Sequence, residues 1–388
     1  MIRIDDSVIT AQVLQDRLGS ERAVELCPRA KLTPSAIDFL RERDVEIVRR
    51  EAGSSERVSV ESPAASASGQ RRDFKGIFCP NIVIFDGNGK VNYGEMERYV
   101  NWLIDAGIHG LYPNGSTGEF VRLSWEERQD VVRLIAQVNS GRVPILAGAS
   151  EANTRDVLKM AEFYASIDVD AISLVPPYYY KISDESLFEY FAEIAEQSPL
   201  DILLYNIPQF TQELPLELME RLLPYERIFG TKDSSRDLPR LINTMHRLRA
   251  QRPDYVVLVG CEEILFPSVM MGASGGTIAT SGIVPEVIVE LYDQALANNV
   301  DRARMLQYRI LDLINLMLLG VNFPEGFKTG VAVRGFDVGP ARTSASDGEQ
   351  EYLLKLESQI GCVLSDMGYA VRGARACPIT NLPPIVGR

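Results

Sequence analysis

ILLYNIPQFTQELPLELMERLLPYERIFGTKDS, residues 202–234, holds two short apolar runs separated by a longer stretch of helical period. The runs at residues 202–208 and 227–234 have the length of strands and are bounded by turn residues. The stretch between them repeats its apolar residues at the spacing of an amphipathic helix. Two strands joined by such a helix are predicted to lie parallel, because the crossover returns the chain to the same edge of the sheet.

The same alternation of strand-like and helical runs occurs eight times along the chain. The strand-like runs begin at Gly76, Gly107, Val143, Ala171, Ile202, Arg227, Tyr255 and Gly275. Eight such units fit either a closed barrel or an open doubly wound sheet. Even spacing, without a dinucleotide-type GxGxxG turn, favours the barrel. We therefore predict an α/β protein with a (β/α)8 TIM barrel over residues 73–298.

Both ends of the chain extend beyond this barrel. Residues 1–50 are predicted to form a small helix-strand unit. Residues 51–72 are rich in Ser, Ala and Glu, and are predicted to be a flexible linker because they hold too few large apolar residues to offset the entropy of ordering. Three further helical patterns in residues 299–388 predict a C-terminal helical region, followed by an irregular tail.

Composition narrows the class of partner. Forty Lys and Arg against fifty-three Asp and Glu give a net charge of -13, which opposes general binding to nucleic acid or to anionic membrane surfaces. No apolar run approaches the roughly 20 residues of a membrane-spanning helix. The five cysteines are scattered, which predicts neither a zinc site nor a disulfide framework and favours a reducing, cytoplasmic location. A small molecule is the expected partner.

Strand ends carry the candidate site, because the carboxyl ends of barrel strands meet on one face. GSTGE, residues 115–119, follows the second strand, and its glycines allow backbone N–H groups to form a cradle for an anion such as a carboxylate. Ser116 and Thr117 add two hydroxyls. A plain glycine-rich turn between strand and helix is the alternative.

Tyr205 and Lys232 end two successive strands, so a barrel would bring them to one pocket. Desolvation favours the neutral amine of a lysine, which can attack a carbonyl and form an imine. A tyrosine beside it can relay protons. The alternatives are a solvated lysine that begins a loop and a tyrosine that only packs its ring.

Two further groups follow other strands. Glu262 and Glu263 could bind hydroxyls of a polyol or begin a solvated helix, and the three tyrosines of PPYYYK, residues 176–181, could reach the pocket, reach a neighbouring subunit or simply pack. The two histidines, His109 and His246, have no carboxylate or cysteine at ligand spacing, which disfavours metal-dependent chemistry.

Taken in order, GSTGE, PPYYY, YNIP, GTKDSS and GCEE resemble the motifs of the dihydrodipicolinate synthase and N-acetylneuraminate lyase family of class I Schiff-base aldolases. The resemblance covers roughly residues 75–368. It implies a TIM barrel with C-terminal helices, a homotetramer built as a dimer of dimers, and pyruvate bound as an imine without a cofactor or metal.

The resemblance also implies roles for individual residues. Lys232 matches the lysine that forms the imine, and Tyr205 matches the tyrosine that shuttles protons. Ser116 and Thr117 match the pair that holds the substrate carboxylate. Tyr179 matches the tyrosine that reaches across the tight-dimer interface into the neighbouring subunit and completes a proton relay there. The Ser/Thr hydroxyl of that relay is Ser116 or Thr117, with Ser116 preferred.

One position departs from the pattern of the synthases of lysine biosynthesis. The resemblance implies an arginine two residues after the proline of YNIP, but this chain has Phe210 there. Glu262 and Glu263 look more like the acidic pair of the sialic-acid lyase branch. The expected substrate is therefore a polyhydroxylated 2-keto-3-deoxy sugar acid, which the enzyme cleaves to pyruvate and an aldehyde or forms from them. The alternatives are a 4-hydroxy-tetrahydrodipicolinate synthase, which uses aspartate semialdehyde, a 2-keto-3-deoxy acid dehydratase, and a non-catalytic sensor or scaffold that binds a small acid.

The N-terminal unit shows a separate similarity. Its stretch LTPSAIDFLRERDVEIV, residues 32–48, resembles the start of ethanolamine-utilisation cobalamin adenosyltransferases. That resemblance implies an association with bacterial microcompartments through residues 1–50. A simple accessory appendage is the alternative.

Overall fold

The fold is described from a computed structural model. It covers residues 72–318 and 322–369, together with residues 2–57 except 5–7, 10, 20, 27–29, 33–35, 37–38, 42, 44 and 52–53. The expected C-terminal tail, residues 371–388, lies outside these described residues, as does most of the expected linker.

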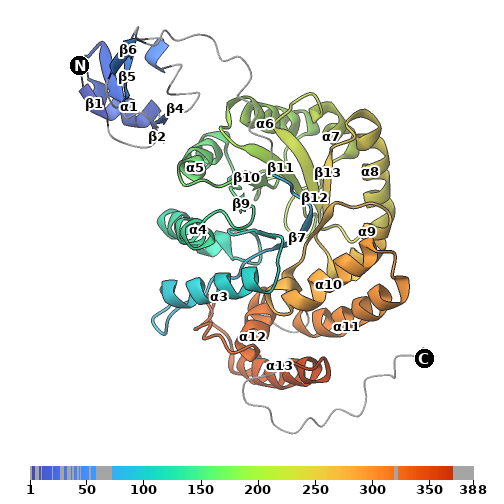
Figure 1. The fold of residues 1–388 in the computed structure, drawn as a ribbon. Coiled ribbons are helices and arrows are strands. Elements are labelled where there is room, and N and C mark those ends of the chain that lie inside the picture. Colours follow the sequence, from blue (N-terminus) through green and yellow to red (C-terminus); the bar gives the residue numbers. More distant parts are fainter. Residues whose placement is uncertain are drawn as a thin grey trace.

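Eight parallel strands form the central barrel (Figure 1). They are β7 (Gly76–Cys79), β8 (Gly110–Leu111), β9 (Leu146–Gly148), β10 (Ala171–Leu174), β11 (Asp201–Asn206), β12 (Ile228–Asp233), β13 (Val256–Val259) and β14 (Gly275–Thr277). Hydrogen-bonded neighbours follow the order β8-β7-β14-β13-β12-β11-β10-β9, and a parallel bridge between Leu111 and Ile145 joins the two outer strands. The predicted TIM barrel is confirmed.

Helices alternate with the strands and surround them (Figure 1). They are α3 (Tyr93–Asp105), α4 (Trp125–Asn139), α5 (Thr154–Ser166), α6 (Asp184–Gln197), α7 (Leu216–Leu222), α8 (Leu238–Gln251), α9 (Leu265–Met270) and α10 (Pro285–Leu296). Local capping fixes their starts: the Ser124 side chain accepts from the Glu127 amide, and the Glu127 carboxylate accepts from the Ser124 amide. Aromatic and aliphatic side chains, including Phe74, Phe78 and Phe229, fill the barrel interior.

Three helices follow the barrel: α11 (Val300–Leu318), α12 (Glu325–Val333) and α13 (Asp347–Asp366). They pack on one another and on the outside of the barrel. Cys362 of α13 is disulfide-bonded, although the scattered spacing of the cysteines predicts no disulfide framework. Within the part of the chain that the structure describes, no helix has the length and apolar character needed to cross a membrane.

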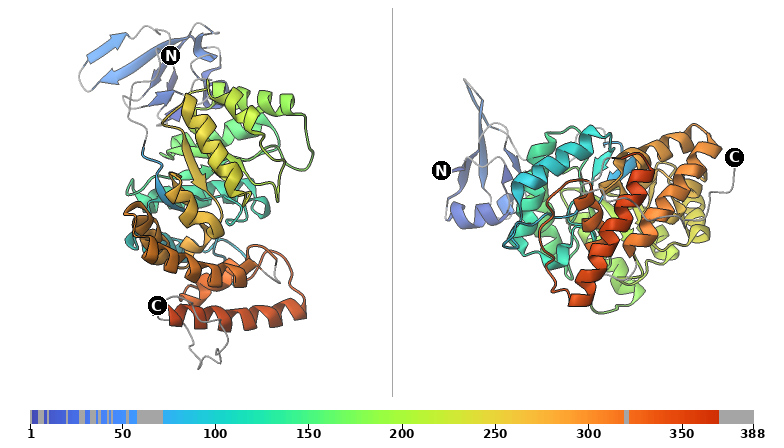
Figure 2. Two further views of the ribbon diagram at one scale, coloured as in Figure 1. Left: turned by 90° about the vertical axis from the view of Figure 1, so that its right-hand side faces the viewer. Right: turned by 90° about the horizontal axis from the view of Figure 1, so that it is seen from below.

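The N-terminal unit has a small sheet of its own, shown in blue in Figure 2. Parallel strands β1 (Ile2–Ile4), β3 (Ala23–Leu26) and β5 (Glu46–Glu51) are joined by an antiparallel β6 (Ser54–Arg57), α1 covers Ala11–Leu18, and β2 (Val8–Ile9) pairs with β4 (Lys31–Leu32). The expected linker from residue 51 is therefore wrong at its start. Backbone pairing with β5, rather than burial of apolar side chains, orders residues 54–57.

Candidate active site

Lys232 and Tyr205 lie side by side at the carboxyl ends of β12 and β11. Their Cα atoms are register partners in the parallel ladder, so both side chains point to the same side of the sheet. Each side chain belongs to a residue that is only 4% exposed. Lys232 Nζ lies 4.0 Å from the centroid of the Tyr205 ring. The amine and the phenol therefore share one secluded cavity, which both residues line.

The surroundings of the Lys232 amine are aromatic. Nζ also lies 4.7 Å from the centroid of the Tyr112 ring, and it makes no hydrogen bond or ion pair with a described residue. Tyr112 donates its hydroxyl to Ser173 Oγ at 3.0 Å, and burial raises the pKa of this phenol, which keeps it protonated. Sequence analysis missed Tyr112, although it ends its strand much as Tyr205 does.

Asp233 anchors the end of β12 on the face of the strand opposite the Lys232 side chain. Its carboxylate accepts from Asn206 Nδ2 and from the Ser235 amide, each at 2.8 Å, and lies 3.3 Å from Arg240 Nε. Because neighbouring strand residues point to opposite faces, this buried network lies on the other side of the strand from the Lys232 amine. It fixes β11 and β12 relative to each other and thereby fixes the amine and the phenol.

Ser116 and Thr117 line the same cavity, on the turn that follows β8. Neither hydroxyl makes a hydrogen bond with a described residue, so both are free to bind a ligand. The turn is tight: the Glu119 amide donates to the Ser116 carbonyl at 3.0 Å. A Cβ at Gly118 would lie 2.9 Å from the Asn81 carbonyl oxygen, a close approach that only glycine permits.

Glu119, the last residue of this turn, is completely buried and ion-paired. It adopts a left-handed φ of 55°. Its carboxylate contacts Lys328 of α12, which is also buried, and lies 2.9 Å from Arg122 Nη1. Arg122 also donates to the Phe323 carbonyl at 2.9 Å. This buried ionic network ties the C-terminal helices to the turn that carries Ser116 and Thr117.

The two acidic residues predicted to act as a pair are separated. Glu262 lines the cavity, and one carboxylate oxygen accepts from the Thr280 amide at 2.8 Å. Burial raises the pKa of Glu262, and that backbone hydrogen bond opposes the rise. Glu263 does not line the cavity, and it is ion-paired with Arg236 at 2.9 Å.

Tyr179 points away from the cavity of its own chain. It is 90% exposed, and its φ of 83° is unusual for a residue with a bulky side chain. Its ring packs edge-on against Tyr180, with centroids 4.7 Å apart. The described chain therefore does not bring Tyr179 to Tyr205 and Lys232.

Apolar side chains form the mouth of the cavity. Phe210 and Phe323 face each other with ring centroids 5.6 Å apart, and Ile314, Leu318 and Phe327 complete this wall. An adjoining cavity of about 390 Å³ shares Ser116, Phe210 and Phe323 and is otherwise largely apolar.

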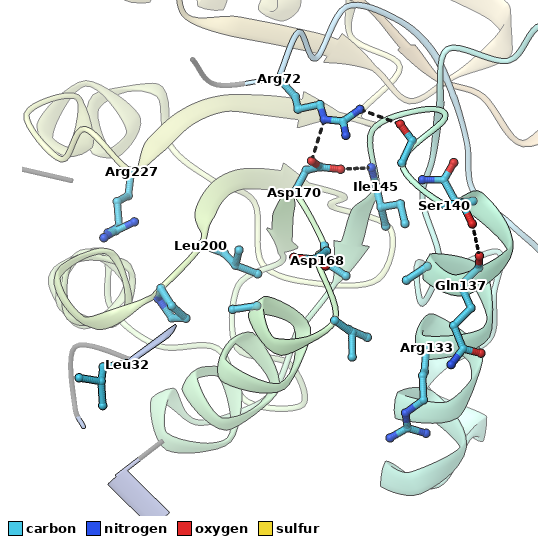
Figure 3. Close-up of a pocket in the computed structure, with 17 residues that line it drawn as sticks. Leu32, Arg72, Arg133, Gln137, Ser140, Ile145, Asp168, Asp170, Leu200 and Arg227 are labelled. Atoms are coloured by element: carbon cyan, nitrogen blue, oxygen red, sulfur yellow. Dashed lines mark hydrogen bonds and ion pairs between the residues drawn. The ribbon is translucent and has the colours of Figure 1, made fainter. Parts of the chain in front are cut away.

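A larger cavity of about 980 Å³ lies at the opposite end of the barrel, where the strands begin (Figure 3). Asp170 accepts from the Ile145 amide at 2.8 Å and pairs with Arg72 at 3.1 Å. Burial raises the pKa of Asp170 in spite of both partners. None of the site residues predicted from the sequence lies there.

Comparisons with known proteins agree with this fold. The model of the Dihydrodipicolinate synthetase family matches residues 73–362. A 4-hydroxy-tetrahydrodipicolinate synthase of Methanothrix thermoacetophila is 32% identical over 284 residues, which cover 73% of this chain and 95% of the relative. An uncharacterized DapA-like lyase of Thermofilum pendens is 30% identical over 301 residues, 77% of this chain and 99% of the relative.

A solved structure shows the same architecture. YagE, a prophage protein of the dihydrodipicolinic acid synthase family from E. coli K12, crystallised in complex with pyruvate, superposes with a TM-score of 0.71. It is 28% identical and covers 75% of this chain and 98% of its own.

The barrel, its C-terminal helices and these relatives define the class of protein: a lyase of the class I aldolase type. More narrowly, the chain belongs to the dihydrodipicolinate synthetase family. The enzyme assignment made from the sequence is confirmed, which leaves the non-catalytic sensor without support.

Proposed function

We propose that Lys232 forms a Schiff base with the C2 carbonyl of a 2-oxo acid and that the enzyme joins or separates pyruvate and an aldehyde. The observation that carries the proposal is the buried Lys232 amine, without a charged partner among the described residues, beside the Tyr205 phenol. A neutral lysine amine is the nucleophile that such an addition requires.

The proposed cleavage proceeds in balanced steps. The amine adds to C2 and water leaves, which gives a protonated imine that withdraws electrons from C3. The C3–C4 bond breaks as the C4 hydroxyl loses its proton, and the products are an aldehyde and an enamine. Protonation at C3 and hydrolysis then release pyruvate and the amine. Tyr205 relays protons in these steps, while Ser116 and Thr117 hold the substrate carboxylate.

Tyr179 is proposed to act in a second copy of the chain. Its exposed ring and left-handed φ suit a residue that projects into a neighbouring subunit. The apolar cavity beside Ser116 has room for such a ring. In the proposed tight dimer, Tyr179 of each chain completes the proton relay of its partner through Ser116, and two such dimers form a tetramer.

The proposed substrate is a polyhydroxylated 2-keto-3-deoxy acid. Glu262 supports this choice, because it lines the cavity and its carboxyl group can form a hydrogen bond with a substrate hydroxyl. Glu263 is less available, since it is paired with Arg236. Phe210 offers no charge to the carboxylate of aspartate semialdehyde, which disfavours a 4-hydroxy-tetrahydrodipicolinate synthase. A dehydratase would use the same imine.

The location of the enzyme is proposed to be cytoplasmic. The scattered cysteines support this location, whereas the disulfide of Cys362 weighs against it. Association with a bacterial microcompartment through residues 1–50 rests on the sequence similarity alone.

Borohydride reduction in the presence of pyruvate, followed by intact mass spectrometry, tests the proposal. The wild-type protein should gain one reduced pyruvate adduct, and Lys232→Ala should gain none while keeping its circular dichroism spectrum. Lys159→Ala removes an exposed lysine of α5 and serves as the matched control, which should be labelled like wild type. Failure of the wild-type protein to be labelled, or labelling of Lys232→Ala, would overturn the proposal.

A further inference from the structure

Arg236 is a cavity residue that the sequence analysis did not single out. It follows β12 in the segment KDSSRD and lines the same cavity as Lys232. Its φ of 64° is left-handed, a conformation that is unfavourable for a residue with a side chain. Such backbone outliers cluster at functional sites.

One edge of the Arg236 guanidinium is held and the other is free. Nε lies 2.9 Å from Glu263 Oε1. Nη1 and Nη2 make no hydrogen bond with any described residue. A carboxylate at Nε restrains the plane of the guanidinium, so the Nη groups are presented in a restricted orientation, as they would be for binding a ligand.

The rest of the cavity lining makes this cation distinctive. Among the residues that line the cavity, only Lys232 and Arg236 are cationic, and Lys232 is used by the proposed imine. Phe210 and Phe323 form the apolar part of the mouth. Glu262 is the acidic residue in the lining, and burial raises its pKa, which weakens its repulsion of an anion.

We propose that Arg236 determines specificity by binding an anionic group, a carboxylate or a phosphate, at the end of the aldehyde that is remote from its carbonyl. The inference rests on the proposed function, because the aldehyde must approach the enamine on Lys232 and extend toward the mouth. A guanidinium fork matches the geometry of both anions, and its charge-assisted hydrogen bonds are roughly twice as strong as neutral ones. Arg236 lies on another loop than Phe210, so a preference for carboxylate-bearing aldehydes would return aspartate semialdehyde to the candidates that Phe210 alone disfavours.

Matched aldehydes test the inference in the direction of addition to pyruvate. Succinic semialdehyde is compared with butanal, and glyceraldehyde 3-phosphate with glyceraldehyde. The wild-type enzyme should prefer one or both anionic members by about 10-fold to 100-fold in kcat/KM. The pair with the larger ratio identifies carboxylate or phosphate. Equal rates within both pairs would overturn the inference and point to a neutral acceptor.

Variants locate the effect at Arg236. Arg236→Gln should remove the preference by lowering kcat/KM for the anionic aldehyde while leaving the neutral aldehyde within about twofold, and Arg236→Lys should restore part of it. Arg304→Gln, which removes an exposed arginine of α11, should behave like wild type. A preference that survives in Arg236→Gln contradicts the inference.

Borohydride trapping separates the two proposals. Arg236→Gln should still form the pyruvate adduct, since Arg236 is proposed to contact only the aldehyde. Adduct formation without any preference for anionic aldehydes would reject the role of Arg236 and leave the lysine mechanism standing. Absence of the adduct in the wild-type protein would reject the lysine mechanism itself.

Discussion

Each end of the barrel holds a cavity, but the charged groups in the two cavities differ in whether they have partners. Where the strands begin, the Asp170 carboxylate is satisfied by Arg72 and by the amide of Ile145. Where the strands end, the Lys232 amine faces the rings of Tyr112 and Tyr205 and has no charged partner among the described residues. The end with the paired carboxylate has the larger cavity, about 980 Å³ against about 120 Å³ around Lys232 and about 390 Å³ in the adjoining cavity.

If the proposed mechanism holds, cavity size does not mark the reacting end of the molecule. A carboxylate with two partners has little left to offer a ligand. An amine without a charged partner among the described residues is available to form a covalent bond with a ligand. Substitutions at the two ends should therefore separate activity from stability.

The largest expected contrast comes from Tyr205→Phe. Loss of the proposed proton relay should lower kcat by about 10²-fold to 10⁴-fold, while the melting temperature changes little because the ring remains. Arg72→Ala at the other end should cost about 1 kcal/mol of stability or less, since its partner pair is partly exposed, and kcat should stay within about twofold. Steady-state kinetics and thermal melts measure both, and similar losses of kcat in the two variants would erase the contrast.

The next effect concerns the ionic network behind the active-site turn. Lys328→Met should destabilise the protein by about 3 kcal/mol, because the buried Glu119 keeps only Arg122 as a partner. It should also raise KM for pyruvate, since the turn carries Ser116 and Thr117. Urea unfolding and initial-rate kinetics measure the two effects.

Charge removal provides the control for that prediction. The double variant Lys328→Met/Glu119→Gln removes the uncompensated carboxylate and should recover part of the lost stability. Lys355→Met, in an exposed pair with Glu351 on α13, should change neither stability nor KM appreciably. No recovery in the double variant would show that the charge balance is not what matters.

The smallest expected effect is a pH dependence at the end where the strands begin. His109 Nδ1 accepts from the Ile77 amide at 3.2 Å, and burial lowers the pKa of this ring from its ordinary value of 6.5. The unfolded chain therefore binds the proton more readily than the folded one. Stability is retained above pH 6.5 and falls as the pH is lowered through that value toward the folded pKa.

His109→Asn keeps an acceptor without a titrating ring and should flatten this dependence. Melting temperatures from pH 7.5 down to about pH 5 measure it. An unchanged slope in the variant would assign the pH dependence to another group.

Much of the fold follows from local patterns, because every β/α unit carries its own period and its own turn. Residues at strand ends could also be predicted from the sequence. Once two neighbouring parallel strands are recognised, Lys232 and Tyr205 are expected to lie side by side at their carboxyl ends. Residues 54–57 were missed because main-chain pairing, which leaves little trace in side-chain composition, orders them.

The rest of the site depends on contacts between segments far apart in the sequence. The pairing of Glu119 with Lys328 joins the second barrel unit to α12, and no local pattern announces it. The different placements of Glu262 and Glu263 depend on the short turn after β13, which points one into the cavity and the other toward Arg236. Arg236 has no recognisable signal in the sequence, and its left-handed backbone conformation is known only from the structure.

The way the barrel closes has one further consequence. β8 is two residues long and meets β9 through a single bridge, so the ladder is thinnest beside the turn that bears Ser116 and Thr117. The position of this turn then depends heavily on the ion pair between Glu119 and Lys328 of α12. In the proposed chemistry, α12 contacts no reacting atom. Sequence drift in that helix could thus retune substrate affinity gradually, leaving the lysine and its phenol untouched.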